Sequence, residues 1–310
     1  MREEKVKKKT GLGQRNRNRM IFYIIGVSLP VLQFCIFYIG VNFNSILLSF
    51  QDFDLSTGKY SYVGLENFRW IVNEFKASDN LINAVGRSFI AFGFTLLQMF
   101  LALLFSFYIY KKETASGLFK TVLFMPKIIS GVILVIIFKF LVQEALPEIF
   151  TSLKPFSLLN AYPEERRFWP VMFFAVWTGF GSNVLLFGGA MSGISDSVVE
   201  AAQLDGITPL KEFFLITVPM IFSTLSTFIL MAVAGIFTNQ LGLYSFYGNG
   251  ASPKIWTFGY YLFKETQEAG SYGYEKLPRL AAIGLCLTAV TVPVIMVVRK
   301  GLDKLGPKVE

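Results

Sequence analysis

The sequence predicts an all-α, polytopic membrane protein with six transmembrane helices. Of its 310 residues, 53% are hydrophobic and only 16% are charged, whereas about a quarter of the residues in soluble domains are charged. A helix needs about 20 predominantly apolar residues to cross a bilayer. Six segments meet this requirement with few or no charges: 20–48, 84–110, 118–142, 169–192, 213–238 and 279–298. The first is too long for the apolar core of a signal peptide, and no cleavage pattern follows it, so we expect a retained helix.

Basic residues predict how the chain is oriented in the membrane. Lys and Arg concentrate in cytoplasmic segments, and here they form three clusters. These are Arg2, Lys5, Lys7, Lys8, Lys9, Arg15, Arg17 and Arg19; Lys111, Lys112 and Lys120; and Arg299, Lys300, Lys304 and Lys308. All three clusters lie on one side only if the number of helices is even and both termini are cytoplasmic. Six helices satisfy this condition.

Three parts of the chain follow from this orientation. They are a basic cytoplasmic tail (1–19), a six-helix transmembrane domain (20–300) and a cytoplasmic C-terminal tail (301–310). A basic tail of this density could bind nucleic acid, but its place directly before a membrane helix favours a role in orientation. We therefore expect lipid and not nucleic acid as a partner.

The residue types present argue against catalysis by this chain. It contains no His, which is the commonest general base and metal ligand. Cys35 and Cys286 both lie inside predicted helices, so no disulfide framework or metal site is expected. The nearest approach to a phosphate-binding loop, residues 117–121, lacks the required glycine spacing. We expect no cofactor bound by this chain and no ATP hydrolysis by it.

The segment 193–219, which we call the 193–219 loop, differs from ordinary cytoplasmic loops. It has one basic residue, Lys211, against four acidic ones, which are Asp196, Glu200, Asp205 and Glu212. Ser197 and Glu200 match a capping box that begins a helix, and Gly206 is placed to end it. Thr208 and Pro209 then predict the start of a second helix. The loop is expected to form two short helices beneath the membrane.

The first of these helices carries small apolar residues whose exposure to water would be unfavourable. They are Val198, Val199, Ala201, Ala202 and Leu204. Apolar surface in a water-facing loop usually marks a partner site. The alternative is an amphipathic connection that rests on lipid.

The spacing in this loop resembles the EAA signature of binding-protein-dependent ABC transporter permeases. That signature is E-A-A, three residues, G, nine residues, I, one residue and L-P; here Val218 replaces the usual Leu. The resemblance implies a type I ABC importer permease fold with a cytoplasmic coupling helix. It also implies contact with an ATPase through Glu200, Ala201, Ala202, Asp205, Gly206, Pro209, Ile216 and Pro219.

Other stretches resemble the sugar-permease branch of this family. They are Val63–Phe68, Phe124–Pro126, Trp177–Phe180 and Phe237–Asn239. The resemblance implies that the cargo is a sugar or oligosaccharide, imported across the cell membrane of a bacterium. The implied partners are a second, related permease in a heterodimer, two ATP-binding subunits that hold ATP and Mg, and an extracellular solute-binding lipoprotein.

Cargo contacts are expected inside the helix bundle. Polar and aromatic residues within spans usually face a cavity or a neighbouring helix. The candidates are Trp177, Gly179, Ser182 and Asn183 on the fourth helix and Phe237, Asn239 and Gln240 at the outer end of the fifth. The alternative is that the small and polar members only pack helices together.

Two cations inside predicted spans, Arg87 and Lys127, depart from the sugar branch. Snorkelling to the inner interface accounts for Lys127, and contact with an anionic cargo group is the alternative. Three other functions stay open. They are an ABC importer for a phosphorylated or anionic small molecule or a peptide, a secondary transporter or channel, and a structural membrane scaffold.

Overall fold

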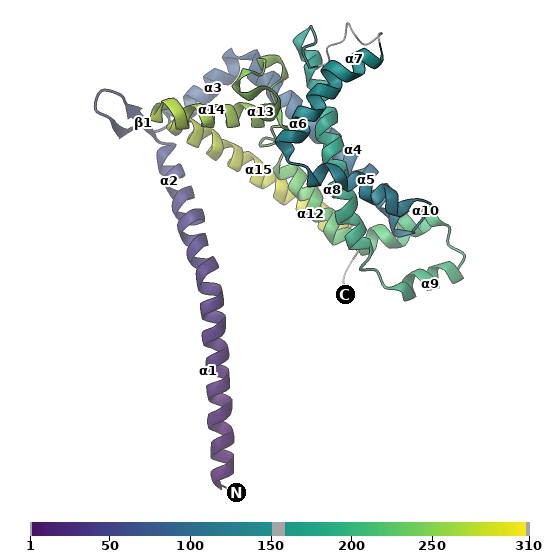
Figure 1. Cartoon of the computed structure of the whole chain (residues 1–310). Coiled ribbons are helices and arrows are strands. Elements are labelled where there is room, and N and C mark those ends of the chain that lie inside the picture. The colour runs from purple at the N-terminus through teal and green to yellow at the C-terminus, as the bar shows by residue number, and fades with distance from the viewer. Residues whose placement is uncertain (1, 151–158, 308–310) are drawn as a thin grey trace. The chain divides into compact units, whose positions relative to one another are not determined.

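The computed structural model describes residues 2–150 and 159–307 and is mainly helical (Figure 1). The chain divides into two compact units. The first contains residues 1–70 and 274–285, and the second contains residues 71–273 and 286–310.

The first unit begins with a long helical segment. It comprises α1 (Arg2–Gln33), a π-helical stretch (Phe34–Gly40) and α2 (Val41–Leu48). Described side chains from Arg17 to Leu47 are exposed within this chain. Because so much of this surface is apolar, lipid or another protein has to cover it.

A β-hairpin follows this helix and corrects the all-α expectation. Strands β1 (Gln51–Asp54) and β2 (Lys59–Tyr62) pair antiparallel. The Asp54 carboxylate accepts hydrogen bonds from the turn residues Ser56 and Thr57, which lowers the pKa of Asp54. Gly58 has a left-handed φ of +65° that favours glycine. Local turn chemistry, which an apolar-run search ignores, therefore sets this hairpin.

The other elements are mostly helices. They are α3 (Glu66–Ala77), α4 (Asp79–Tyr110), α5 (Ser116–Ile128), α6 (Gly131–Phe140), a π-helical turn (Leu141–Ala145), α7 (Leu146–Ile149), a 3₁₀ turn (Glu164–Arg167), α8 (Phe168–Met191), α9 (Asp196–Leu204), α10 (Pro209–Glu212), a π-helical turn (Phe213–Thr217), α11 (Val218–Met220), α12 (Phe222–Ala234), α13 (Leu243–Tyr247), 3₁₀ turns (Gly248–Gly250, Pro253–Ile255 and Tyr274–Lys276), α14 (Phe258–Tyr272) and α15 (Leu277–Leu305).

Four helical segments are long and apolar enough to cross a membrane without a break. They are 17–48, 79–110, 164–191 and 274–305. Two further segments pass the same test only as bent pairs, with a bend of 103° between α5 and the segment from α6 to α7 and of 74° between the α10–α11 segment and α12. The sequence therefore supports four to six spans, and the third and fifth predicted spans are not straight helices.

Each bend lies close to a proline. Pro126 is in the last turn of α5, and the next connection, Ile129 and Ser130, is extended. Pro219 precedes Ile221, which separates α11 from α12 with non-helical dihedral angles. Proline removes a backbone donor and clashes with the preceding turn, so a helix bends or ends there. The hydropathy of these segments carries no sign of the break.

Helices α4 and α8 run in the same direction and are joined at two levels. The Gln98 amide donates to the Val176 carbonyl oxygen (2.8 Å), and the Ser106 hydroxyl donates to that of Val184 (2.9 Å). From the first bond to the second, the donors advance by eight residues along α4 and the acceptors advance by eight residues along α8, so the two helices are parallel. Two spans that run in parallel require the chain to return between them.

Helix α5 runs antiparallel to α8. A side chain at Gly181 of α8 would collide with the backbone carbonyl of Leu123 in α5. Farther along, Gly117 of α5 and Gly188 of α8 line one cavity. As residue numbers rise on α5 they fall on α8, so α5 supplies a return path between α4 and α8.

Segment 239–278, which follows the fifth predicted span, packs into the protein. Phe246 of α13 packs against Phe138 of α6 and Phe174 of α8, with ring centroids 6.0 and 5.0 Å away. Tyr260 of α14 is fully buried, and its hydroxyl donates to the Gly248 carbonyl oxygen (2.6 Å). Its aromatic residues make this segment part of the core.

Candidate functional site

The first helix of the 193–219 loop starts two residues earlier than the capping-box pattern indicates. Its N-cap is Ser195 and not Ser197, and no side chain caps the helix. The two hydroxyls instead lie 2.8 Å apart and hydrogen-bond to each other. Glu200 is exposed and remains free to contact another molecule. The capping box is therefore wrong, although α9 itself is present.

Gly206 ends α9 in a Schellman motif. The Gly206 N–H donates to the Gln203 carbonyl (3.0 Å), and the Ile207 N–H donates to the Ala202 carbonyl (3.2 Å). Gly206 has a φ of +70°, a left-handed conformation that side chains disfavour. Thr208 and Pro209 then take the N-cap and first position of α10, as the sequence predicts. The two-helix arrangement of the loop is confirmed.

A buried ion pair attaches this loop to α4. Glu212, at the end of α10, is only 3% exposed. Both of its carboxylate oxygens accept from the Lys111 ammonium, at 2.9 and 3.0 Å. Phe213, the next residue, packs edge-on against Phe107 of α4 (5.2 Å between centroids). The sequence analysis treated Glu212 and Lys111 only as loop charges. The signal that it missed is that Glu212 directly precedes an apolar run beginning at Phe213.

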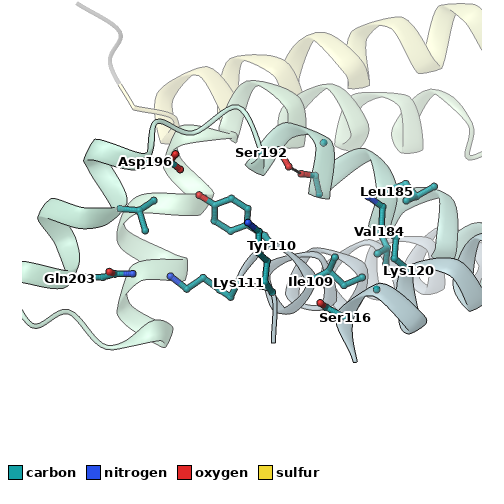
Figure 2. A pocket seen from close by; sticks show the side chains of 15 residues that line it. Ile109, Tyr110, Lys111, Ser116, Lys120, Val184, Leu185, Ser192, Asp196 and Gln203 are labelled. Atoms are coloured by element: carbon teal, nitrogen blue, oxygen red, sulfur yellow. Dashed lines mark hydrogen bonds between the residues drawn. The ribbon is translucent and has the colours of Figure 1, made fainter. Parts of the chain in front are cut away.

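A cavity of about 710 Å³ lies beside this attachment. The ends of α4 and α8, the start of α5 and one face of α9 line it. Figure 2 shows Tyr110 and Lys111 extending from the end of α4 toward α9, which contributes Asp196 and Gln203. α9 is therefore not packed flush onto the helix ends.

The opposite face of α9 is open within this chain. Leu204 is 89% exposed and Ala201 is also exposed, as is Pro209 at the start of α10. Ala202 is 5% exposed and faces the body of the unit. Ile216 and Pro219 are half-buried in the bent segment that follows. The EAA-like residues thus extend from α9 through the Gly206 turn to α11, with Ala202 facing inward and Glu200 and Ala201 exposed.

The four candidates on α8 are placed differently from one another. A side chain at Gly179 would collide with the Gln98 amide, so this glycine allows α4 and α8 to pack closely. Trp177 is 37% exposed beside Phe138 and Phe174. Ser182 has a buried hydroxyl with no hydrogen-bond partner in the described chain, and Asn183 is half-buried.

The candidates at 237–240 do not lie on a helix. α12 ends at Ala234, because the start of α14 packs on the segment that follows. Gly259 lies against the backbone of residues 238–239, and the Thr257 hydroxyl donates to the Asn239 carbonyl (2.9 Å). The prediction that Asn239 and Gln240 continue the fifth helix is therefore wrong.

This segment borders a small cavity between α4 and α12. It measures about 220 Å³, and its lining includes Ser88, Thr95, Gly235 and Asn239. The Asn239 side-chain oxygen accepts from the Leu241 N–H (2.9 Å), whereas the Gln240 side-chain oxygen is buried with no hydrogen-bond partner in the described chain. Phe237 packs edge-on against Phe89 (5.6 Å). No hydrogen bond joins this group to the α8 candidates within the described residues.

Comparison with known proteins identifies a family. The family model for the binding-protein-dependent transport system inner membrane component matches residues 98–310. The sn-glycerol-3-phosphate transport system permease protein UgpA of Pectobacterium atrosepticum is 30% identical over 199 residues, which are 63% of this chain and 66% of that protein. The arabinooligosaccharides transport system permease protein AraP of Bacillus subtilis is 25% identical over 276 residues, or 86% of this chain and 84% of the relative.

Solved structures share the fold at low sequence identity. A chain of a bacterial ABC transporter involved in the import of the acidic polysaccharide alginate is similar with a TM-score of 0.70 and 16% identity. The match covers 96% of this chain and 99% of that one. A second structure of the alginate transporter, in complex with an alginate pentasaccharide-bound periplasmic protein, matches with a TM-score of 0.68.

The family model covers more than half of the chain, including the EAA-like residues of the 193–219 loop. The apolar helices described above fit a protein that passes through the membrane several times. The chain belongs to the family of binding-protein-dependent transport system inner membrane components.

Proposed function

We propose that this chain is the transmembrane permease subunit of an ATP-driven ABC importer that takes up a sugar or oligosaccharide. The observation that carries the proposal is the 193–219 loop, whose α9 is open on one face while Glu212 and Phe213 attach its base to α4. The relatives named for arabinooligosaccharides and for multiple sugar-binding transport in Streptococcus mutans support a sugar cargo.

In this proposal α9 is the coupling helix. Its exposed face, with Glu200, Ala201 and Leu204, docks in a groove of an ATPase subunit, since a short apolar helix face suits such recognition. ATP and Mg are bound on that subunit and not on this chain. When the ATPases close, displacement of α9 reaches α4 through the Lys111–Glu212 pair and moves the helices as rigid bodies.

Six spans follow if each bent pair is one crossing. α4 and α8 run in parallel, so the chain between them has to return across the membrane, and α5 runs in that direction. With six spans, both termini and the 193–219 loop lie in the cytoplasm, as the basic clusters indicate. The basic tail (1–19), the permease domain (20–300) and the C-terminal tail (301–310, of which 308–310 lie outside the described residues) keep the sequence-predicted boundaries.

The complete transporter needs further subunits. We include two ATP-binding subunits, an extracellular solute-binding lipoprotein and a second, related permease. The solved relative in complex with a periplasmic binding protein supports the lipoprotein. The exposed apolar surface of residues 17–47 is compatible with both lipid and a second permease.

Reconstitution of the transporter in lipid vesicles tests this function. The chain is co-expressed with the candidate ATPase, second permease and binding protein, and ATPase activity is measured against a panel of sugars. Stimulation by a sugar only when its binding protein is present would support the proposal. ATPase activity that no sugar stimulates, or a chain that purifies without any ATPase, would contradict it.

A phosphorylated cargo is the second candidate. It is favoured by the relative named for sn-glycerol-3-phosphate transport, which is 30% identical to this chain. Including glycerol 3-phosphate and a hexose phosphate in the same panel separates the two cargo classes.

A further inference from the structure

Lys127 lies level with the middle of α8, a neighbouring helix long and apolar enough to cross a membrane. Leu123 of α5 contacts Gly181 of α8, and Gly181 lies ~15 Å from the Met191 end of α8 at 1.5 Å per residue. Lys127 follows Leu123 by about one turn, or ~6 Å, toward the Phe168 end. It is therefore ~21 Å from one end of α8 and ~14 Å from the other. Both distances exceed the reach of a four-carbon stem, so if the ends of α8 mark the two surfaces, the ammonium lies out of reach of both.

Lys127 has no counter-charge in the described chain. Its side chain is exposed, and it makes no ion pair or hydrogen bond there. By contrast Lys139, the next basic residue, donates to the Phe246 carbonyl oxygen. An unpaired cation at this depth is unfavourable in lipid, and such residues face a water-filled cavity or a partner.

The backbone beside Lys127 indicates a water-filled cavity independently. α5 ends at Ile128, and Ile129 and Ser130 are extended before α6 begins. Ser130 is exposed and Ile129 is half-buried. Non-helical backbone at membrane depth persists only where it is buried in protein or lines water. A cation and a broken helix at one level would both be accommodated by a polar pathway along this side of α5.

We propose that Lys127 binds an anionic group of the cargo, a carboxylate or a phosphate, and that the imported sugar is therefore acidic. This inference rests on the proposed function and specifies its substrate class. A carboxylate or phosphate gives the ammonium a charge-assisted hydrogen bond, whereas a neutral sugar leaves its charge uncompensated. Trp177 of α8 lies at about the same level, and its partly exposed ring is an apolar surface on which a sugar ring could stack.

The test compares three forms of the reconstituted transporter: wild type, Lys127→Met and Lys127→Arg. The cargo panel holds uronate oligosaccharides, sugar phosphates and the matching neutral sugars. We expect only acidic cargo to stimulate the wild type. Lys127→Met should raise the half-saturation concentration for the acidic cargo about ten- to a hundredfold, which is the effect of a lost hydrogen bond to a charged group. Lys127→Arg keeps the positive charge, so its half-saturation concentration should stay within a few-fold of the wild-type value. The uronate and phosphate arms show which anion is the cargo.

A labelling experiment tests the pathway without transport. In a Cys35→Ser/Cys286→Ser background, Lys127→Cys should react with a water-soluble, anionic methanethiosulfonate reagent in vesicles. Leu97→Cys, an exposed position at similar depth on the unbroken α4, is the matched control and should not react. Lack of reaction at position 127 would overturn the proposal.

The two ideas fail differently. Stimulation of the wild type by neutral sugars, or an equal loss for neutral and acidic cargo in Lys127→Met, would overturn the acidic-cargo inference and leave sugar import standing. The second of these results would mean that Lys127 acts on transport without contacting the charge of the cargo. If no member of the panel stimulates ATPase activity, both the inference and the proposed function fall.

Discussion

Glu212 keeps its carboxylate in the protein interior and satisfies it with Lys111. Glu212 has a side chain 4% exposed and Lys111 one 19% exposed, so one end of the pair is desolvated and the other is partly screened. Removing one partner from such a pair leaves an uncompensated charge, which is more destabilising than the absence of both. The pair therefore matters most as a fixed point between the 193–219 loop and α4.

Replacing Lys111 alone should destabilise the protein. Lys111→Met leaves the buried carboxylate unpaired, and we expect the free energy of unfolding to fall by about 2–3 kcal/mol, below the range for fully buried pairs because Lys111 is partly exposed. The measurement is thermal unfolding of the purified transporter. The double variant Lys111→Met/Glu212→Gln removes the stranded charge and should recover most of the loss. If the two substitutions simply add, the pair is not coupled.

Gly206 should be required for coupling and not for cargo recognition. A β-branched residue at a φ of +70° strains the backbone by about 1–2 kcal/mol and disturbs the end of α9. Gly206→Val should abolish cargo-stimulated ATPase activity while the binding protein still binds its sugar. Gly206→Asn, which tolerates the left-handed conformation, is the control and should keep coupling. Normal coupling in Gly206→Val would remove this turn from the mechanism.

If Asn239 and Gln240 both bind the cargo, replacing each of them should have a different effect on transport. The Gln240 side-chain oxygen is buried without a partner, whereas that of Asn239 already accepts from Leu241. We therefore expect Gln240→Ala to raise half-saturation for the cargo with unchanged basal ATPase activity, and Asn239→Ala to have the smaller effect. Transport assays over the sugar panel measure both. Wild-type uptake in both variants would exclude the pair from the cargo site.

At the scale of elements, the close approach of α5 to α8 depends on one glycine. The carbonyl of Leu123 occupies the place where a side chain at Gly181 would lie. Gly181→Ala should push the helices apart and lower stability by about 1–3 kcal/mol, the usual range for overpacking. Gly188→Ala on the same helix is the control, since nothing lies within 4 Å of its added carbon. Equal melting temperatures for the two variants would mean that α5 does not pack here.

Some local patterns in the 193–219 loop predicted its elements, whereas an end that depends on a distant neighbour was not predictable. The turn at Gly206 and the start at Pro209 follow from the conformations that glycine and proline allow. The capping box failed because serine suits an N-cap at position 195 as well as at 197, and the helix begins after Ser195. The end of α12 at Ala234 depends on α14, which follows it in the chain by more than twenty residues.

For the whole molecule, labelling of the termini tests the six-span topology. In the Cys35→Ser/Cys286→Ser background, Lys5→Cys and Lys304→Cys should stay unlabelled when intact cells meet a membrane-impermeant thiol reagent, and should label after permeabilisation. Labelling of either position in intact cells would place that terminus outside. An odd number of spans would label one terminus only.

Composition was sufficient for the general architecture, because lipid demands apolar helices of a fixed length. It did not distinguish a straight span from a bent one, since residues 118–142 and 213–238 are as apolar as their neighbours. The sequence predicted the two short helices of the 193–219 loop. It did not predict the Lys111–Glu212 ion pair that attaches the loop to α4. Glu212 gains meaning only when Lys111, about a hundred positions earlier, is seen beside it.

The two hydrogen bonds between α4 and α8 have a mechanical consequence. Gln98 and Ser106 bond to carbonyls at equal spacing, so sliding either helix by a single residue would break both bonds at once. The two bonds therefore oppose sliding of α4 along α8, and they favour movement of both helices together as one rigid body. If the 193–219 loop couples to an ATPase as proposed, a displacement at Glu212 would move α4 and α8 together over the length of α4, about nine turns.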